Sequence, residues 1–313
     1  MATSTPQPGE DAGDIKAVPV RHYGRWAVAA VVLVVVASLV YSAANNDRFK
    51  WDIFGDYLFS DRVMRGLWLT MWLSVVATVI GVVLGTILAV MRLSTNPVLS
   101  TISLVYIWAF RGTPVLVQIF LWAFIGSIYP EITFGVPFGG PDLISSNSND
   151  LIKPITAAIL GLGLNFAAYQ AEIVRAGLLS VDEGQVEAAK ALGMTGANTM
   201  RRIVLPQAMR VIIPPTGNQA IDMLKTSSLV SVIAVSDLLY SVQLIYGQNY
   251  QQIPLLFVAC FWYLLLTTIF TIGQYYLERH YAKGNLRELP QTPVQRARAM
   301  AASVRFGGTG NSI

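Results

Sequence analysis

The chain contains six long apolar runs, and their lengths constrain the fold more than any other feature of the sequence. They span residues 26–44, 66–91, 113–128, 155–179, 212–242 and 254–277. A helix needs about 20 apolar residues to cross the hydrocarbon core of a bilayer, which is about 30 Å thick. Most of the runs reach that length, and the third gains residues from the segment before it. The sequence therefore predicts an all-α, polytopic membrane protein with about six transmembrane helices.

The composition also places the chain in lipid. Of its 313 residues, 54% are hydrophobic and 13% are charged, whereas about a quarter of a soluble domain is charged. The net charge of +4 comes from basic residues that border the apolar runs, so it does not indicate binding to nucleic acid. No nucleic-acid partner is expected.

The distribution of basic residues predicts the topology, because cytoplasmic loops are enriched in Lys and Arg. One set of loops, together with both terminal segments, holds most of these residues. The opposite set clearly holds only Arg48, Lys50, Arg62 and Lys153. Six crossings put both ends of the chain on one side. We therefore expect both termini and the loop around Glu187 to be cytoplasmic.

The terminal segments differ from the membrane domain, which is expected at residues 25–284. Residues 1–24 and 285–313 have no apolar face to bury, which predicts disordered cytoplasmic segments. The first apolar run, preceded by Arg21 and Arg25, also fits a signal peptide, but its polar leader is long and no good cleavage site follows closely. A retained first helix is favoured. A single cysteine excludes an intrachain disulfide, and two isolated histidines predict no metal site.

A polar segment separates the fourth run from the fifth. The stretch from Glu187 to Pro206, EAAKALGMTGANTMRRIVLP, contains four charged residues that are costly at bilayer depth, so it lies in water. Ala188 and Ala189 favour a helix, Gly193 ends it, a second short helix follows, and Pro206 closes the unit. Two short helices with a small-residue face are typical of a docking element. The alternative is an amphipathic linker that lies on the membrane.

The fourth run carries a polar stripe. Asn165, Tyr169, Glu172 and Ala176 are spaced by four, three and four residues, so they share one face of a helix. A carboxylate inside a membrane faces protein or a water-filled path, so this face is expected to point inward. For Asn165 the spacing leaves open a hydrogen bond between helices or a place in the path. For Glu172 an ion pair with a nearby arginine is the alternative.

The fifth run contains a second polar stripe. Pro214, Pro215 and Gly217 are expected to interrupt the helix near its cytoplasmic start, which frees backbone groups beside a cavity. Asn218, Asp222 and Lys225 follow at intervals of four and three residues. Asp222 and Lys225 either line a path or simply neutralise one another on one face.

Three further segments allow more limited predictions. Pro114 is placed where a helix can begin, so residues 98–110 are expected along the cytoplasmic interface, with Arg111 reaching the interface. Small residues at positions 77, 81, 85 and 89 predict close approach of another helix, within the chain or across a dimer. Residues 127–150 form an external connector or a surface for an external partner.

Four segments together resemble the permease subunits of ABC importers in the polar amino acid uptake family. They are FRGTPVLVQ (110–118), NFAAYQAEIVRAG (165–177), the EAAKALG loop (187–193) and GNQAIDMLKTSSLVSVIAVSDLL (217–239). The resemblance covers about residues 61–278. It has two departures: Thr226 stands where Asp or Asn is frequent, and Asp222 stands where a small polar residue is usual. The role that the family's residues have at these two positions therefore cannot be assigned to Asp222 and Thr226.

The resemblance implies the type I permease fold of ABC importers and a set of partners. These are an identical or related permease, two cytoplasmic ABC ATPase subunits on the Glu187 loops, an extracytoplasmic solute-binding protein and a polar amino acid, at the plasma membrane of a bacterium. The chain lacks the GxxxxGK[ST] phosphate loop and any recognisable catalytic constellation, so it is expected to be no enzyme and to hold no cofactor. ATP and Mg would bind the partner ATPase.

The candidate site residues follow from these patterns. For the substrate path they are Asn165, Tyr169, Glu172, Asn218, Asp222 and Lys225. For ATPase coupling, within a loop at residues 183–206, they are Glu187, Ala188, Ala189, Gly193, Leu205 and Pro206. An ion-gradient-driven transporter of amino acids, with Glu172 or Asp222 as the ion site, is the main alternative, although no convincing inverted repeat is visible. A membrane scaffold that transports nothing is a third hypothesis.

Overall fold

The computed structural model describes residues 23–135 and 142–282. The predicted disordered tails therefore lie outside the described residues, except for positions 23 and 24. The chain divides into a unit that ends at Trp51 and a larger unit from Asp52 onward, and each is described by itself.

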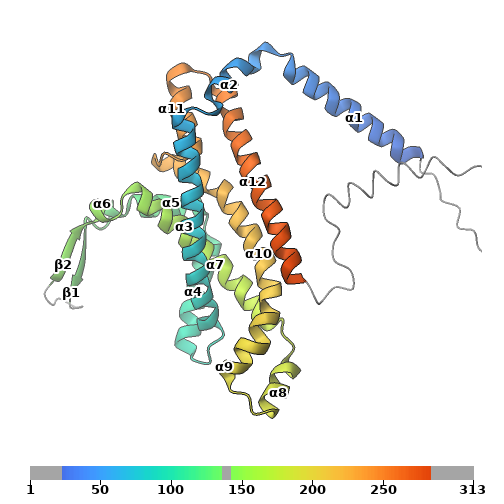
Figure 1. The fold of residues 1–313 in the computed structure, drawn as a ribbon. Coiled ribbons are helices and arrows are strands. Elements are labelled where there is room, and N and C mark those ends of the chain that lie inside the picture. The colour runs from blue at the N-terminus through green and yellow to red at the C-terminus, as the bar shows by residue number, and fades with distance from the viewer. Residues whose placement is uncertain (1–22, 136–141, 283–313) are drawn as a thin grey trace, which may run out of the picture. The chain divides into compact units, whose positions relative to one another are not determined.

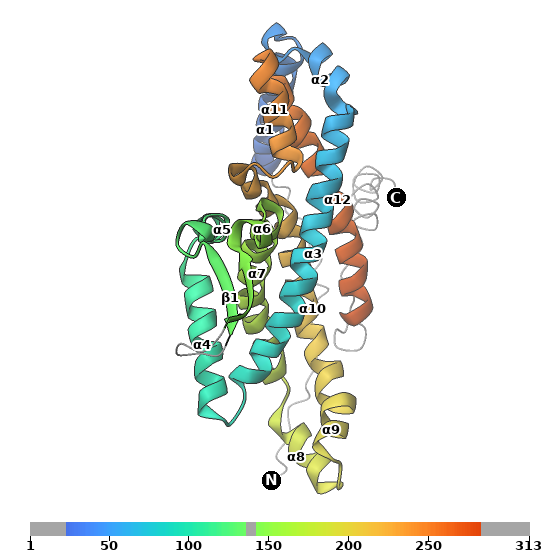
Figure 2. The ribbon, with the colours of Figure 1, turned by 90° about the vertical axis from the view of Figure 1, so that its left-hand side faces the viewer.

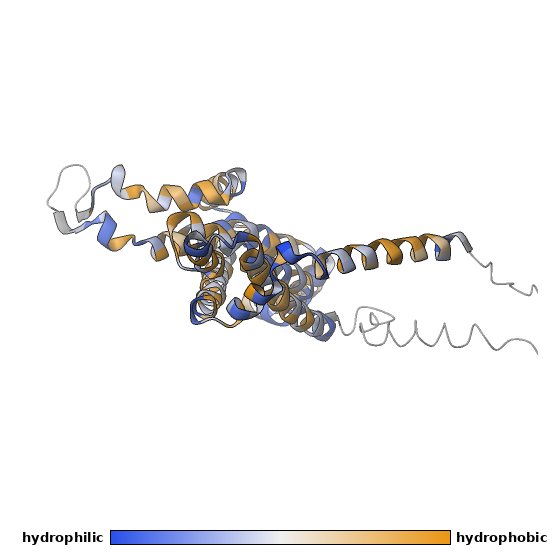
Figure 3. Cartoon of the chain, turned by 90° about the horizontal axis from the view of Figure 1, so that it is seen from above, coloured by the Kyte–Doolittle hydropathy of each residue, from blue (hydrophilic) through white to orange (hydrophobic). Residues whose placement is uncertain are grey.

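The first unit is a single long helix with a capped turn after it. Helix α1, Tyr23–Ala44, is apolar all round and exposed along its length, as its colouring in Figure 3 shows. It is long and apolar enough to cross a membrane. The turn η1, Asp47–Phe49, begins at Asn46, whose side chain accepts from the backbone N–H of Arg48 at 3.0 Å.

The second unit is a bundle of long helices (Figures 1 and 2). In chain order its main helices are α2 (Trp51–Leu58), α3 (Asp61–Arg92), α4 (Pro97–Gly112), α5 (Val115–Ala123), α7 (Pro154–Leu179), α10 (Leu205–Thr226), α11 (Leu238–Asn249) and α12 (Gln252–Ala282). Among the described residues, four helices including α1 could each cross a membrane, and two bent pairs raise the number to six if each pair is one span. Six crossings were predicted.

The third crossing needs the helix before it, as predicted, but that helix does not follow the predicted course. Helices α4 and α5 meet at 102°, and α5 has only nine residues, so residues 113–128 cannot form a span alone. Helix α4 runs alongside α3 and α7, as two hydrogen bonds show. Ser103 Oγ donates to the Leu88 carbonyl of α3 at 2.7 Å, and Tyr106 Oη donates to the Leu164 carbonyl of α7 at 2.9 Å. The prediction that residues 98–110 lie across the bundle ends, along the interface, is therefore wrong.

The fifth crossing breaks at a different place from the predicted one. Helix α10 continues through Pro214 and Pro215. Side chains also bond two carbonyls of this stretch: Thr216 Oγ1 donates to the Ile212 carbonyl at 2.7 Å, and Gln274 Nε2 donates to the Pro214 carbonyl at 3.0 Å, which ties α12 to α10. The bend of 46° instead follows the 3₁₀ turn η4, Ser227–Ile233, where Ala234 has φ of 59°.

A small hairpin is the exception to the helical architecture. Strands β1 (Glu131–Gly135) and β2 (Asp142–Asn147) pair antiparallel, with Glu131 opposite Asn147 and Thr133 opposite Ser145. Short turns flank the pair: η2 (Ile125–Ser127) precedes it and α6 (Ser148–Leu151) follows it. The described part of residues 127–150 thus contains a hairpin that projects from the helices, and α6 connects it to the N-terminal end of α7 (Figure 1).

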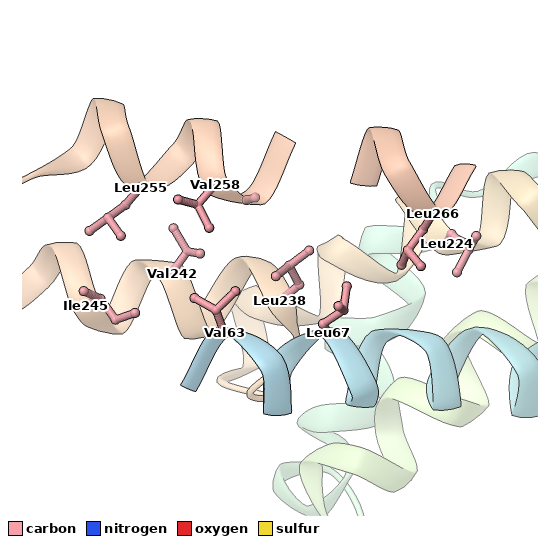
Figure 4. Packing of buried hydrophobic residues seen from close by; sticks show 10 residues of the cluster. Val63, Leu67, Leu224, Leu238, Val242, Ile245, Leu255, Val258 and Leu266 are labelled. Atoms are coloured by element: carbon pink, nitrogen blue, oxygen red, sulfur yellow. The ribbon is translucent and has the colours of Figure 1, made fainter. Parts of the chain in front are cut away.

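The small residues of α3 allow α7 to approach closely. A Cβ at Gly81 would lie 2.3 Å from the Phe166 side chain, and one at Gly85 would lie 2.7 Å from the Gln170 side chain. The predicted groove is therefore filled by a helix of the same chain. Beyond it, Val63 and Leu67 of α3 pack on α11 and α12 in the cluster drawn in Figure 4. Within the second unit, α3 thus packs against α4, α7, α10 and α11.

Candidate substrate cavity and coupling segment

A cavity of about 570 Å³ lies between α7 and α10, with one residue contributed by α4. Its walls are formed by Arg111 of α4, by Tyr169, Glu172, Ile173 and Ala176 of α7, and by Val211, Pro215, Asn218, Gln219 and Asp222 of α10. Four of the six residues predicted for the path line this cavity: Tyr169, Glu172, Asn218 and Asp222. The cavity therefore joins the two polar stripes that the sequence contains.

Glu172 forms the predicted ion pair and also lines the cavity. Its Oε2 atom accepts from Arg175 Nη2 at 2.9 Å and from Arg175 Nε at 3.2 Å, which is an ion pair one helical turn apart. The same side chain lines the cavity, and 26% of it is exposed. A nearby arginine thus balances the carboxylate without removing it from the cavity wall.

Asn165 occupies a different place from its three neighbours on the stripe. Its Nδ2 atom donates to the Phe110 carbonyl at 3.0 Å and to Gln118 Oε1 at 3.2 Å. Gln118 in turn donates to the Phe110 carbonyl at 2.9 Å. Asn165 is not among the residues that line the cavity. Of its two predicted roles, this geometry favours the hydrogen bond between helices, because it ties α7 to the elbow between α4 and α5.

The α10 wall carries the second ion pair. Asp222 Oδ1 lies 2.7 Å from Lys225 Nζ, and both side chains are more than half exposed. Asp222 lines the cavity and Lys225 does not. The two residues therefore neutralise one another, as one of the two alternatives predicted. Lys225 affects the cavity through its ion pair with Asp222.

Sequence reasoning missed Arg111 and Gln219 as cavity residues. The Arg111 guanidinium carbon lies 5.2 Å from the centre of the Tyr169 ring, a cation–π distance. Gln219 Nε2 donates to the Phe166 carbonyl of α7 at 3.3 Å. Arg111 was expected only to reach an interface. The missing information was the course of α4, which brings the last turn of that helix to the middle of α7.

The coupling segment contains the two predicted short helices, α8 (Glu183–Ala191) and α9 (Gly196–Thr199), at one end of the bundle (Figures 1 and 2). Asp182 caps α8 by accepting from the Gly184 backbone at 2.8 Å. Gly193 separates the two helices with φ of +74°, a conformation that favours glycine. Thr195 then caps α9 by accepting from the Asn198 backbone at 3.4 Å.

Two details of the coupling segment differ from the prediction. Pro206 does not close the unit, because a π-helical turn, Met200–Val204, leads from α9 directly into α10 and Pro206 lies in the first turn of that helix. Ala189 is 1% exposed, so it packs inside the segment, whereas Glu187, Ala188, Gly193, Leu205 and Pro206 are exposed. Leu192, not predicted, is 82% exposed.

Within the described ranges, no group of three or more His, Cys, Asp or Glu residues could hold a metal ion.

These features define a helical membrane protein with a polar cavity between two spans and an exposed segment that connects them. A family described as binding-protein-dependent transport system inner membrane component matches residues 81–283. The arginine transport system permease protein ArgU of Corynebacterium glutamicum is 48% identical over 290 residues, which are 92% of this chain and 88% of that protein. The L-cystine transport system permease protein TcyB of Bacillus subtilis is 36% identical over 192 residues, covering 61% of this chain and 74% of that protein.

Solved structures agree with this relationship. A crystal structure of an amino acid ABC transporter with histidines is 34% identical, with a TM-score of 0.59 over 70% of this chain and 94% of that chain. An inward-facing MetNI methionine ABC transporter, at 20% identity and a TM-score of 0.55, covers 71% and 99% of the two chains and shows the shared fold. The chain belongs to the binding-protein-dependent family of inner membrane components, the permease subunits of ABC importers. It has their type I fold, and these relatives give no support to an ion-gradient-driven transporter.

Proposed function

We propose that this permease forms the translocation path of an ATP-driven importer for polar amino acids, with the α7–α10 cavity as part of the path. One observation carries the proposal: charged and amide side chains of three helices converge on one cavity of about 570 Å³. Pockets for small molecules usually measure roughly 300–1,000 Å³. Arginine is the first substrate to test, because the relative at 48% identity is named as an arginine permease.

The lining suits a zwitterion better than an apolar solute. Once water is lost, both the ammonium and the carboxylate of an amino acid need partners, because an unpaired charge in a dry site is costly. Arg111 supplies a cation, Glu172 and Asp222 supply carboxylates, and Asn218 and Gln219 supply amides. Both signs of charge are thus present in one cavity.

The coupling segment is connected to both walls of this cavity. The C-terminal end of α7 leads into α8, and α9 leads without a break into α10. Val181, Val204, Ala208 and Ile212 share one buried cluster with Val174 of α7. A displacement of residues 183–206 would therefore move α7 and α10 together. This supports Glu187, Ala188, Gly193, Leu205 and Pro206 as contacts for an ATPase, with Ala189 as an internal packing residue.

The complete importer would then contain two copies of this permease or this chain with a related one, two cytoplasmic ATPases that bind ATP and Mg, and an extracytoplasmic solute-binding protein. Both termini of the permease would be cytoplasmic. Transport would follow from alternating access, in which ATP and substrate favour different states of the path.

Uptake by the purified complex tests this function. The permease, its copurifying ATPase and the binding protein are reconstituted in vesicles, and accumulation of labelled arginine, glutamine, glutamate and cystine is measured with ATP on the ATPase side. We expect accumulation of at least one of these, abolished by an ATPase variant with its phosphate-loop lysine replaced and unaffected by ionophores. Uptake that follows the ion gradient, or that is confined to sugars or phosphate, would refute the proposal.

A further inference from the structure

One acceptor in the cavity wall has no donor. The Oε1 atom of Gln219 is buried and accepts no hydrogen bond from any described residue. One bond distinguishes the oxygen of this amide from its nitrogen, because Nε2 donates to the Phe166 carbonyl at 3.3 Å and the reverse orientation would place two acceptors together. A buried acceptor without a donor is destabilising, so its presence in a cavity wall points to a donor that arrives with a ligand. In the rest of the described chain, only Ser60 Oγ shares this property, and it lies before α3, outside the cavity.

One cation in the same wall is also incompletely paired. The Arg111 guanidinium lies over the Tyr169 ring at 5.2 Å and forms no hydrogen bond or ion pair with the described residues. A cation–π contact uses the face of the ring and leaves the planar N–H donors free for a carboxylate. Unlike Arg111, both acids of the cavity have ionic partners: Glu172 is paired with Arg175, and Asp222 is paired with Lys225. Beside the exposed Asn218 amide, the cavity thus contains one cation without an ionic partner and one buried acceptor without a donor.

We propose that Gln219 and Arg111 bind the two charges that every free amino acid carries. The Gln219 carbonyl oxygen accepts from the α-ammonium group, and the Arg111 guanidinium donates to the α-carboxylate. The amide reaches the ligand by rotation about its last side-chain torsion, which is soft in glutamine. This inference rests on the proposed function and extends it, because it assigns recognition of the amino acid backbone to two residues that the sequence patterns did not single out.

Equilibrium binding tests the assignment on the permease–ATPase complex without its binding protein, so that the permease alone selects the ligand. The probe is labelled L-arginine, and the competitors are 5-guanidinovaleric acid, which lacks the α-ammonium group, and agmatine, which lacks the carboxylate. A hydrogen bond to a charged group accounts for about tenfold or more in affinity. We therefore expect the wild-type complex to prefer arginine to each analogue by about tenfold or more.

Substitutions separate the acceptor of Gln219 from its donor. Gln219→Met removes both, so the preference for arginine over 5-guanidinovaleric acid should fall to about onefold, while the preference over agmatine is kept. Gln219→Glu keeps an acceptor and loses the bond to the Phe166 carbonyl, so it should keep the preference for the ammonium group. Arg111→Gln should give the converse result, with the preference over agmatine lost. Thr216→Val is the matched control, because it removes a Gln170 hydrogen bond of 3.0 Å in the same α7–α10 contact, outside the cavity lining.

The outcomes distinguish this inference from the proposed function. If the wild-type complex binds arginine and Gln219→Met keeps both preferences, the assignment of Gln219 is wrong while the function stands. If Thr216→Val abolishes the preference as Gln219→Met does, packing explains the effect and the assignment also fails. If the wild-type complex neither binds arginine nor accumulates any of the four amino acids, the proposed function itself fails. Should Gln219→Met not assemble, the comparison of Gln219→Glu with Arg111→Gln decides the matter.

Discussion

At the scale of single residues, Asn165 and Asn218 show how two similar side chains in neighbouring helices serve different purposes. Asn165 bonds to the elbow between α4 and α5, whereas Asn218 is exposed in the cavity wall. The helical spacing predicted an inward face that contains Tyr169 and Glu172, because a carboxylate avoids lipid. Spacing alone did not place Asn165, since its partners lie 55 and 47 residues away on other helices. Long-range pairing of this kind depends on the path of the chain.

The contrast between these two residues is testable. Asn165→Leu leaves Gln118 Oε1 without a donor and removes one of the two side-chain donors to the Phe110 carbonyl, which costs about 1–3 kcal/mol. We expect a lower melting temperature and a lower yield of the complex, with uptake per assembled complex largely kept. Asn218→Leu, the matched change in the cavity wall, should do the opposite: normal yield and several-fold slower uptake. If both variants lose yield and uptake in the same proportion, the distinction between the two residues is wrong.

At the scale of structural elements, the broken helices account for most differences between sequence-based expectation and structure. Two adjacent prolines indicated a break in the fifth crossing, yet α10 continues through both of them. The break occurs at Ala234 instead, beyond a 3₁₀ turn that no glycine or proline marks. Asp237 fixes the new start by accepting from the Tyr240 backbone at 2.8 Å. The short helices of the coupling segment were predictable, because local caps and Gly193 determine them.

Gly193 provides a test of the coupling element. Valine at φ of +74° is strained by about 1–3 kcal/mol, so Gly193→Val should displace α8 relative to α9. We expect weaker copurification of the ATPase, or ATP hydrolysis that no longer responds to the loaded binding protein, while the permease still inserts. Gly196→Ala is the control, because a Cβ there meets no atom within 4 Å and its φ is not positive. Wild-type coupling in Gly193→Val would exclude this element as the ATPase contact.

At the scale of the whole molecule, the arrangement of the second unit links the cavity to the exposed coupling segment. The helical class was predictable from hydrophobic length, since lipid imposes a minimum span, and the described residues supply the six expected crossings if each bent pair is one span. The hairpin after α5 was not predictable, because its strands are short and lie in a segment rich in Gly, Pro, Ser and Asn. The elbow of 102° between α4 and α5 was also missed, although it brings Arg111 into the cavity. The cavity is therefore a product of tertiary packing.

The central claim is that the α7–α10 cavity opens to different sides of the membrane during ATP-driven transport. Its most direct test is the accessibility of a single cysteine, Asn218→Cys, in a background where the only native cysteine is removed by Cys260→Ser. The complex is reconstituted in vesicles of known orientation and labelled with a membrane-impermeant thiol reagent from each side. We predict labelling from the cytoplasmic side without nucleotide and protection from that side when ATP and vanadate trap the closed ATPases. Labelling from one side at the same rate under every nucleotide condition would contradict the account.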